Sequence, residues 1–512
     1  MLRYRQVVRL LQRRTYSAGA ANTGSGLPGD DESGKDDLHP IRRTLRLLGN
    51  DMRKVKEFFV PKDPEPEEDR ILTQTKFQFA GEREKDPTLV DDFQTHCDVL
   101  IIGGGGVGSS IAYWLKEKAR DGLNVVVVER DDTYAQSATR VSVGGLCQQF
   151  SLPENIQMSL FAAEFLRGAK KHFGEDVPLQ FTPHGHLMLA DEEHAESLMR
   201  SSQVQNELGA RNELLTSDRL AIRFPWLNTK GIVLGCHGLE KEGWFNPLAL
   251  LSNFRRSASG YGAHFVSGQV VDFEFLSQTD ITVVGGSDEG SYTGLDKAVI
   301  QLADGTRRTC KFALCVIAAG ARSGEVARLA KIGVGSGVLR VPLPIDERKR
   351  YLYAINSLAQ SAPGMSMPMT IDPSGIFIRR DGLGGNYICG QDSVEDSHSS
   401  SVDPQYFDQH IRPKLAERVP ALGEARVVDS WAGSYDQNVY DENGIVGAHP
   451  YYNNLYIATG FSGHGVQQSL AVGRAVSELI MDGQFRTIDL SRLSFDRLIV
   501  DQPMYELNNV LS

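Results

Sequence analysis

The stretch DVLIIGGGGVG at residues 98–108 decides the fold of this 512-residue chain. A short apolar run, IAYWL, follows it at residues 111–115, and VVVVER stands at residues 125–130. The pattern predicts a buried strand, a glycine turn, a helix and a second strand that ends in an acid. This order of elements is typical of a dinucleotide-binding βαβ unit.

The glycines of the turn have the spacing Gly103-x-Gly105-x-x-Gly108. The first permits the tight turn, the second lets a pyrophosphate approach the backbone, and the third lets the helix pack close to the sheet. Glu129 is placed to accept a hydrogen bond from a ribose hydroxyl. The alternative is a structural unit in which the glycines serve packing alone. The residues predicted to bind the cofactor here are Gly103, Gly105, Gly106, Val107, Gly108, Glu129 and Arg130.

The composition, with 41% hydrophobic and 23% charged residues, is that of a globular protein large enough for two or three domains. A net charge of −11 argues against a nucleic-acid partner, because no domain-wide basic surface is available to neutralise phosphates. No apolar run reaches the roughly 20 residues that a membrane-spanning helix needs. We therefore predict no nucleic-acid binding and no membrane span.

The six cysteines show no CxxC pair and no zinc-ligand spacing, so no metal site is predicted. Cys310 and Cys315 have the spacing of a redox pair, but they lie in a predicted strand. Five positions apart in a strand places them on opposite faces and about 16 Å apart, beyond the ~7 Å limit for a disulfide. We expect buried free thiols.

The N-terminal region differs from the rest, because residues 1–29 hold five arginines and no acid. A basic, acid-free, amphipathic segment is typical of a mitochondrial transit peptide, which we place at residues 1–16. This predicts the mitochondrial matrix, and the alternative is a disordered basic tail. Residues 17–91 are expected to hold a disordered stretch, a basic helix at 40–60 and an acidic proline linker at 61–70. The basic helix either docks on the main body or contacts an acidic surface such as the inner membrane.

The remaining chain predicts a mixed α/β (α+β) fold in which two domains are interleaved. Helices are expected at 153–173, 247–261 and 465–481, strands at 184–190, 231–237 and 454–459, a hairpin at 298–318, and a loop at 287–294. The Rossmann-like cofactor domain takes residues 92–178, 246–335 and 431–485. The antiparallel-sheet substrate domain takes 179–245 and 336–430, and 486–512 form a C-terminal tail.

Two further segments favour FAD as the dinucleotide. LCVIAAGAR at residues 314–322 predicts a buried strand that ends in small residues, and NLYIATGFSGHGVQQ at 454–468 predicts a strand, a glycine turn and a helix start. A second helix N-terminus aimed at a flavin ring would stabilise negative charge there. No second strand–GxGxxG–helix unit is present, so the reductant is expected to be a substrate and not a nicotinamide. These segments and their surroundings add Ser142, Gly144, Val270, Ala319, Gly320, Gly460, Gly463, His464, Gly465 and Val466 to the predicted cofactor site.

From about residue 95 to 483 the chain resembles the FAD-dependent D-amino-acid oxidase and glycine oxidase superfamily, especially its sarcosine and dimethylglycine dehydrogenase branch. The matching stretches are VLIIGGGGVGSSIAYWL, VVVVER, SVGGLCQQFS, GWFNPLALL, VIAAGAR and NLYIATGFSGHGVQQSLAVGRAVSELI. The resemblance implies oxidation of the C–N bond of a small secondary amine or N-methyl amino acid. It extends to a mitochondrial member that is linked to assembly of respiratory complex I, which implies complex I subunits or assembly factors as partners.

The chain departs from this family at four positions. Ser142 stands where dehydrogenase relatives carry a flavin-linking histidine, and Gly433 stands where the small oxidases carry a flavin-linking cysteine. We therefore predict non-covalent FAD. Gln467 replaces a lysine that promotes reaction with oxygen, which favours an electron-transfer flavoprotein or a quinone as the acceptor. Cys147 stands where relatives often have arginine, so the mode of carboxylate recognition is open.

The candidate catalytic residues are His464, Gln467, Tyr353 and Arg350. A substrate carboxylate needs a cationic partner, normally arginine, and the other candidates for this role are Arg140 and Arg379. Tyr351 shares a strand face with Tyr353, and either a pocket-lining or a packing role fits the pair. His184 and His186 are expected to share a strand face as satisfied structural residues.

Two functions fit the sequence. The first is a flavoprotein dehydrogenase that acts on a small amine. The second is a flavin-stabilised assembly factor for complex I whose catalysis is vestigial. Gly105, Glu129 and Gly463 favour cofactor binding under both, whereas the features at Ser142, Cys147 and Gln467 favour the second.

Overall fold

The computed structural model describes residues 93–507, except 136, 175–176, 283–290, 393–401 and 403–404. The predicted transit peptide at residues 1–16 lies outside the described residues. The same holds for the predicted disordered stretch, basic helix and acidic linker within 17–91.

A seven-stranded sheet forms the cofactor half of the fold, and its centre is parallel. β1 (His96–Ile102) pairs in parallel with β2 (Val125–Glu129) on one side and with β10 (Arg307–Ile317) on the other. The valines and isoleucines of these strands are buried on both faces, as expected for a parallel sheet covered by helices. The other strands are β8 (His264–Thr282), β9 (Ser291–Leu302), β16 (Ile445–Ala448) and β17 (Leu455–Thr459).

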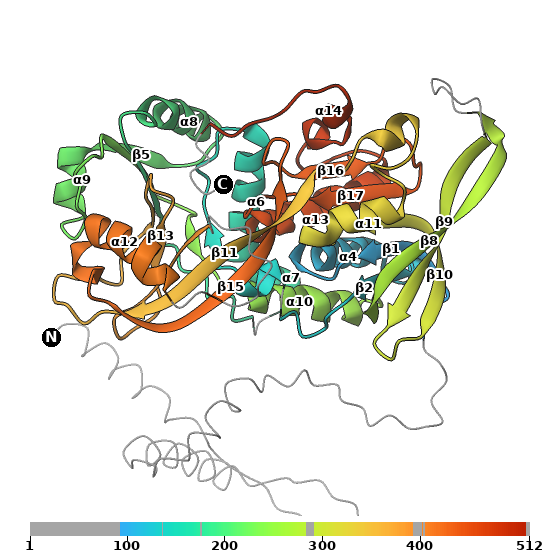
Figure 1. The fold of residues 1–512 in the computed structure, drawn as a ribbon, viewed down its shortest axis with the longest axis horizontal. Coiled ribbons are helices and arrows are strands. Elements are labelled where there is room, and N and C mark those ends of the chain that lie inside the picture. Colours follow the sequence, from blue (N-terminus) through green and yellow to red (C-terminus); the bar gives the residue numbers. More distant parts are fainter. Residues whose placement is uncertain are drawn as a thin grey trace, which may run out of the picture. The chain divides into compact units, whose positions relative to one another are not determined.

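Helices cover this sheet and enclose two apolar cores. α4 (Gly106–Ala119) packs between α10 (Pro247–Gly260) and α13 (Gly465–Asp482), as Figure 1 shows. α11 (Ser323–Leu329) contributes to the second core. α6 (Pro153–Arg167) packs on α13, and α7 (Ala169–Phe173) follows it.

An eight-stranded sheet forms the second half, in the order β15-β11-β14-β13-β12-β4-β6-β5. Its neighbours are antiparallel except β4 and β12, which pair in parallel. Its strands are β4 (His186–Ala190), β5 (Asn212–Thr216), β6 (Leu234–Gly238), β11 (Ile345–Asn356), β12 (Met369–Ile371), β13 (Phe377–Arg380), β14 (Asn386–Asp392) and β15 (Arg426–Asn438). Its helices are α8 (Ala195–Glu207), α9 (Ser217–Arg223) and α12 (Arg412–Arg418). The short strands β3 (Gly145–Leu146) and β7 (Gly243–Trp244) pair separately.

The chain passes between the two sheets several times, which confirms the predicted mixed fold with interleaved halves. The long strands β11 and β15 pair at one end of the second sheet, where β15 is the edge strand (Figure 1). β15 continues to Asn438, so the second sheet extends past the boundary predicted at residue 430.

Three local predictions were wrong. The helix expected over 153–173 is divided at Gly168, which caps both α6 and α7. The loop expected over 287–294 gives way to strand β9 from Ser291 onward, because β9 pairs with β8 there. His184 lies outside β4, after which Gly185 adopts a φ of +86° and redirects the chain.

The cysteines are buried and unbridged, as predicted for Cys310 and Cys315. The Sγ atoms of Cys97 and Cys310 lie 3.7 Å apart across neighbouring strands.

In the part of the chain that the structure describes, no helix combines the length and apolar character that a bilayer span requires.

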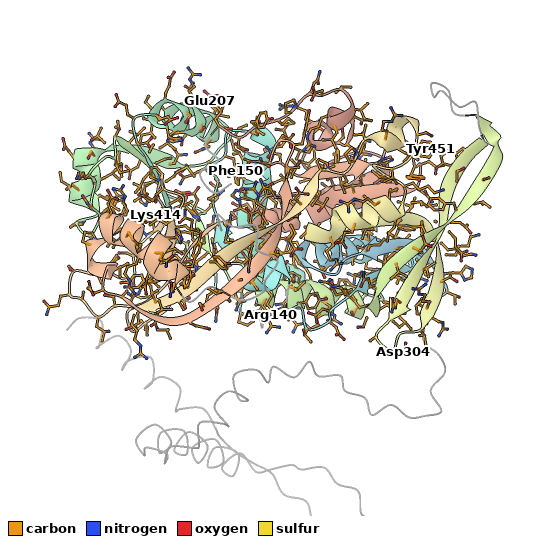
Figure 2. The ribbon with its side chains drawn as sticks, viewed as in Figure 1. Arg140, Phe150, Glu207, Asp304, Lys414 and Tyr451 are labelled. Atoms are coloured by element: carbon orange, nitrogen blue, oxygen red, sulfur yellow. The ribbon has the colours of Figure 1, made fainter. Side chains whose placement is uncertain are left out.

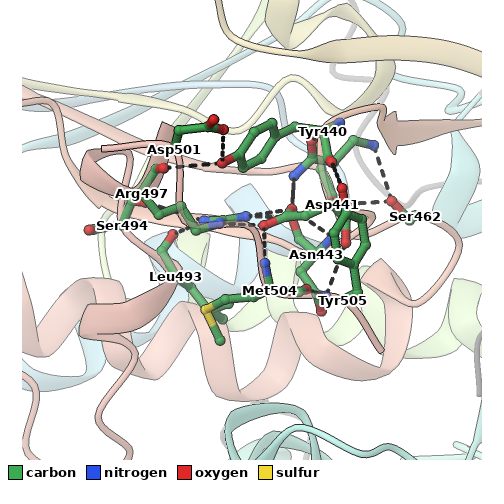
Figure 3. A network of polar contacts seen from close by, with 12 residues as sticks. Tyr440, Asp441, Asn443, Ser462, Leu493, Ser494, Arg497, Asp501, Met504 and Tyr505 are labelled. Atoms are coloured by element: carbon green, nitrogen blue, oxygen red, sulfur yellow. Dashed lines mark hydrogen bonds and ion pairs between the residues drawn. The ribbon is translucent and has the colours of Figure 1, made fainter. Parts of the chain in front are cut away.

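The segment after residue 486 is held to the body by a buried polar network (Figure 3). Arg497 donates to both carboxylate oxygens of Asp441, at 2.7 and 3.0 Å, and both side chains are almost fully buried. Asp441 also accepts from the backbone N–H of Met504 at 3.1 Å. Glu506 accepts from the backbone N–H of Leu152, which precedes α6 and offers no side-chain cap of its own. The described part of the predicted tail, residues 486–507, is therefore an integral part of the fold.

Candidate FAD and substrate site

A cavity of about 1630 Å³ extends from the glycine turn between β1 and α4 to the surface of the second sheet. A pocket for one small ligand has about 300–1,000 Å³, so this cavity can hold a dinucleotide together with a substrate. Of the predicted cofactor residues, the following line it: Gly103, Gly105, Gly106, Val107, Glu129, Arg130, Ser142, Val270, Ala319, Gly320, Gly463, His464, Gly465 and Val466.

The three glycines of the motif have different structural roles. Gly103 adopts a φ of +101°, and a Cβ there would lie 2.3 Å from the carbonyl oxygen of Ala318. A Cβ on Gly108 would lie 1.9 Å from the carbonyl oxygen of Gly103, so this glycine permits close packing of α4. A Cβ on Gly105 would have no neighbour closer than 3.7 Å, and Gly105 lines the cavity. Gly105 is therefore the position at which a ligand can approach the backbone.

The N-terminus of α4 is open toward an anion. Its N-cap residue Gly105 offers no side chain and its first turn has no acidic residue, so nothing within the helix itself neutralises the positive end of its dipole. Thr139 Oγ1 accepts from the backbone N–H of Gly106 at 3.0 Å, which fixes this turn against the segment that follows β2.

Glu129 is held in place at the end of β2. Its Oε2 accepts from the backbone N–H of Gly104 at 2.8 Å, and its Oε1 accepts from that of Asp131 at 3.0 Å. A carboxylate offers about four lone-pair sites, so both contacts leave capacity for a hydroxyl donor. The acid that the sequence assigned to a ribose is thus oriented by the turn that would hold the pyrophosphate.

Asp436, which sequence reasoning missed, orders the second glycine turn. Its Oδ2 accepts from the backbone N–H groups of Gly460 at 2.6 Å and Phe461 at 3.2 Å. Burial raises the pKa of this carboxyl, and the hydrogen bonds from the turn oppose that effect. Gly460 itself does not line the cavity, and its φ of +80° serves the turn. A buried acid in a strand far from the turn carries no sequence signal for this role.

Arg350 is the one predicted carboxylate-binding arginine that lines the cavity. Its guanidinium lies 4.8 Å from the ring centre of Tyr435 and 5.7 Å from that of Phe377. A Cβ on Gly463 would lie 3.0 Å from its Nη2, so Arg350 packs directly on the glycine turn. Its position at the junction of the two halves suits a substrate anion.

The other two arginines, Arg140 and Arg379, do not line the cavity. Arg140 is exposed at the edge of the molecule and donates to the carbonyl oxygen of Thr133 at 2.6 Å (Figure 2). Arg379 is buried, donates to the carbonyl oxygen of Val143 at 3.1 Å and pairs with Asp381 at 2.9 Å. Both positions speak against a substrate contact.

His464 and Gln467 meet the segment that contains Cys147. Gln467 Oε1 accepts from the backbone N–H of Cys147 at 2.9 Å, and its Nε2 lies 3.5 Å from Nδ1 of His464. Phe150 presents its ring to that of His464 with 4.9 Å between centres. Burial raises the pKa of the Cys147 thiol to about 12, so this residue stays protonated. Both predicted residues line the cavity.

Tyr353 does not line the cavity, and its position speaks against the catalytic role predicted for it. Side chains alternate along a strand, so Arg350 and Leu352 of β11 reach the cavity while Tyr351 and Tyr353 point to the opposite face. There Tyr353 packs on Phe407, with 4.9 Å between ring centres.

Gly144, which was predicted to bind the cofactor, does not line the cavity either. A Cβ there would lie 2.0 Å from the carbonyl oxygen of Phe245, so this glycine permits close packing of two backbone segments.

His186 was expected to be a satisfied structural residue, and this prediction was wrong. It is the first residue of β4, it is 2% exposed, and it lines the cavity beside Gly145 and Met369. Its Nδ1 has no hydrogen-bond partner among the described residues. His184 does not share its face and instead packs on Trp244, with 5.6 Å between ring centres.

Glu242 is a buried acid that holds the backbone around His186 and the segment at Gln148 in place. Its Oε1 accepts from the backbone N–H of Gln148 at 2.6 Å and its Oε2 from the side chain of Gln149 at 3.0 Å. It also receives the backbone N–H of His186, and burial raises its pKa from 4.5 to about 7.

This raised pKa predicts a pH dependence of folding. Between pH ~4.5 and ~7 the unfolded chain releases the Glu242 proton while the folded chain keeps it, so the free energy of unfolding falls as pH rises through that window. The expected loss is on the order of 3 kcal/mol. Glu242→Gln should remove this slope in urea unfolding measured at several pH values. Glu207→Gln, an exposed position on α8 (Figure 2), should keep it, and an equal slope in both variants would contradict the assignment.

The comparisons with known proteins agree with this geometry. The pattern of the family described as DAO, FAD dependent oxidoreductase, matches residues 98–479. The chain belongs to this family. FAD is therefore its cofactor, as the sequence predicted, and the residues present fit it: one cavity contains an open glycine turn, a helix N-terminus without an acid in its first turn, and an oriented acid at the end of β2.

The chain is similar to the FAD-dependent oxidoreductase domain-containing protein 1 homolog of Drosophila melanogaster, with 83% identity over 516 residues and 100% of both chains covered. It is also similar to monomeric sarcosine oxidase of Bacillus sp. (strain B-0618), with 22% identity over 79% of this chain and 96% of that protein. Among solved structures, L-proline dehydrogenase from P. horikoshii matches with a TM-score of 0.66 and 22% identity, covering 80% of this chain and 100% of that one. At that identity the structural match shows the fold alone.

Proposed function

We propose that this FAD-dependent oxidoreductase oxidises the C–N bond of a small secondary amine or N-methyl amino acid. The observation that carries the proposal is the single cavity in which Arg350 and the second sheet face the two glycine turns. A substrate anchored at Arg350 would therefore lie within the same cavity as the cofactor. The similarity to a sarcosine oxidase supports this substrate class.

FAD would be held by the turn at Gly105, by Glu129 and by the turn at Gly463, and when bound it supplies an acceptor for a hydride from the substrate. Arg350 would bind and orient a substrate carboxylate through its planar, two-pronged guanidinium. Leu352 and Phe377 line the cavity with apolar surface. Such surface excludes water and disfavours an alkylammonium cation, so it favours the neutral amine.

The proposal is tested by anaerobic titration of the FAD-loaded protein with a panel of amines that includes sarcosine, N,N-dimethylglycine and proline. Bleaching of the flavin absorbance by at least one amine is expected. Arg350→Met should weaken the response to amino acids more than the response to amines without a carboxylate. An absence of bleaching across the panel would remove the catalytic part of the proposal and favour the assembly factor with vestigial catalysis.

We expect FAD to be bound without a covalent link. The Ser142 hydroxyl accepts from the backbone N–H of Gly144 at 3.1 Å. A Cβ on Gly433 would lie 2.2 Å from a methyl carbon of Val141, so a flavin-linking side chain has no room there. Acid precipitation should release the yellow colour into the supernatant. Colour that stays on the pellet would contradict this prediction.

Gln467 supports an acceptor other than oxygen. Its amide is neutral and is already engaged by Cys147, so no cation stands at this position to promote reaction with oxygen. We propose an electron-transfer flavoprotein or a quinone as the acceptor. Stopped-flow mixing of the reduced protein with air-saturated buffer should show slow reoxidation, and mixing with a quinone analogue should show faster reoxidation.

We further propose that the protein acts in the mitochondrial matrix in connection with assembly of respiratory complex I. The arginine-rich, acid-free N-terminus supports import, and the resemblance to a mitochondrial family member supports the assembly role. A reporter fused to residues 1–40 should enter mitochondria, and a cytosolic reporter would contradict the localisation. Cells without the protein should contain less assembled complex I.

A further inference from the structure

His186 is a buried histidine that faces the cavity without satisfied ring nitrogens. Nδ1 has no partner, and no hydrogen bond to Nε2 is formed among the residues that the structure describes. Nε2 is the ring nitrogen next to Gly145, since a Cβ on that glycine would lie 3.6 Å from it. Gly145 and His186 both line the cavity. The imidazole therefore presents a polar edge to bound ligand.

A second histidine shows what a structural role looks like in this fold. His449 is also 2% exposed, but its Nδ1 accepts from the backbone N–H groups of Tyr451 at 3.2 Å and Tyr452 at 3.4 Å, and only its Nε2 has no partner among the described residues. Buried polar groups in native proteins are almost always bonded. Of these two buried histidines, only His186 lacks a bond at both nitrogens and lines the cavity, so a ligand bound there can supply the missing partner for Nε2.

The surroundings of His186 define the chemistry of that ligand. His464, Gln467 and Cys147 line the same part of the cavity, and Glu242 lies on the backbone side, where it receives the N–H of His186. Burial, aided by His464, lowers the pKa of His186 to about 3. The imidazole is therefore neutral, with one donor and one acceptor nitrogen, and does not serve as the cation for a carboxylate.

We infer that His186 is a substrate-binding residue that accepts a hydrogen bond from the N–H of a neutral secondary amine. This inference rests on the proposed function and adds a specificity: a tertiary amine has no N–H to donate. Accepting that hydrogen leaves the nitrogen lone pair free, as oxidation of the C–N bond requires. Arg350, which lines the same cavity, would supply a separate contact for a carboxylate.

The test compares sarcosine with N,N-dimethylglycine, which differ by one methyl group on nitrogen. The FAD-loaded full chain is titrated anaerobically with each, and the dissociation constant is taken from the change in the flavin spectrum. The unmodified protein is expected to bind sarcosine at least about tenfold more tightly, since one hydrogen bond of this kind is worth about a factor of ten. His186→Leu should bring the ratio of the two dissociation constants to about one. His186→Gln, which keeps a hydrogen-bond acceptor, should restore part of the preference for sarcosine.

Thermal unfolding of the ligand-free protein provides a second readout. His186→Leu should melt at the same temperature as the unmodified protein or higher, because it removes unsatisfied polar atoms from a buried place. His449→Leu is the matched control. It should have a lower melting temperature than the unmodified protein and should keep the same preference for sarcosine over N,N-dimethylglycine. A lower melting temperature for His186→Leu would show a structural role and overturn the inference.

The outcomes separate this inference from the function on which it rests. If amines bleach the flavin but His186→Leu keeps the ratio, His186 is not the specificity residue and amine oxidation stands. If the unmodified protein prefers N,N-dimethylglycine, the inference is also overturned. If no amine binds, both are overturned.

Discussion

Gly105→Val is expected to give a folded protein that does not retain FAD. Gly105 has a φ of −64° and extended backbone, which valine adopts without strain, and a Cβ there meets nothing closer than 3.7 Å. The valine methyl groups would occupy the space in which a pyrophosphate approaches the turn. We expect affinity for FAD to fall at least about 100-fold, about 2.8 kcal/mol. The measurement is flavin content after gel filtration, followed by a titration with FAD.

Gly122→Val is the matched control, because a Cβ at Gly122 would have no neighbour within 4 Å and the residue lies away from the cavity. It should bind FAD as the unmodified protein does. Gly103→Val would be less informative, since its Cβ would clash with the backbone of Ala318 and disturb the fold. Full flavin content in a folded Gly105→Val protein would show that the cofactor does not pass over this turn.

Arg497→Ala is expected to cause a large loss of stability. It would leave Asp441, which is 0% exposed, as an uncompensated buried charge. Removing one partner of such a pair costs about 3–5 kcal/mol. The loss would also free the segment that reaches Met504 and Glu506, which Asp441 and the start of α6 hold in place. The free energy of unfolding from urea titration of the FAD-loaded protein measures the effect.

Lys118→Ala is the control for an ion pair at the surface. Lys118 and Asp482 lie 2.7 Å apart, but their side chains are 42% and 26% exposed. Exposed pairs of this kind contribute at most about 1 kcal/mol. If both variants lose the same small amount, the Arg497 pair does not stabilise the C-terminal segment as Figure 3 indicates.

The sequence by itself determined the parts of this protein that are local along the chain. The first βαβ unit lies entirely within residues 96–129. Two apolar runs, the glycine spacing between them and the acid after the second run were therefore enough to predict it. Similar short patterns predicted the turn at Gly463, the free cysteine thiols and the mixed α/β fold. Each of these features depends on neighbouring residues and on the backbone freedom of particular glycines.

Only the tertiary structure decided which side chains share the cavity. Arg350 and Tyr353 lie on one strand, but their odd spacing places them on opposite faces, and packing against Phe407 determines which face is core. His186 reaches the site because β4 pairs in parallel with β12, a contact between segments far apart in sequence. Asp436 likewise meets its turn only after β15 crosses toward the first sheet. Pairing and packing between distant segments leave no local pattern, so these residues had to be found in the fold.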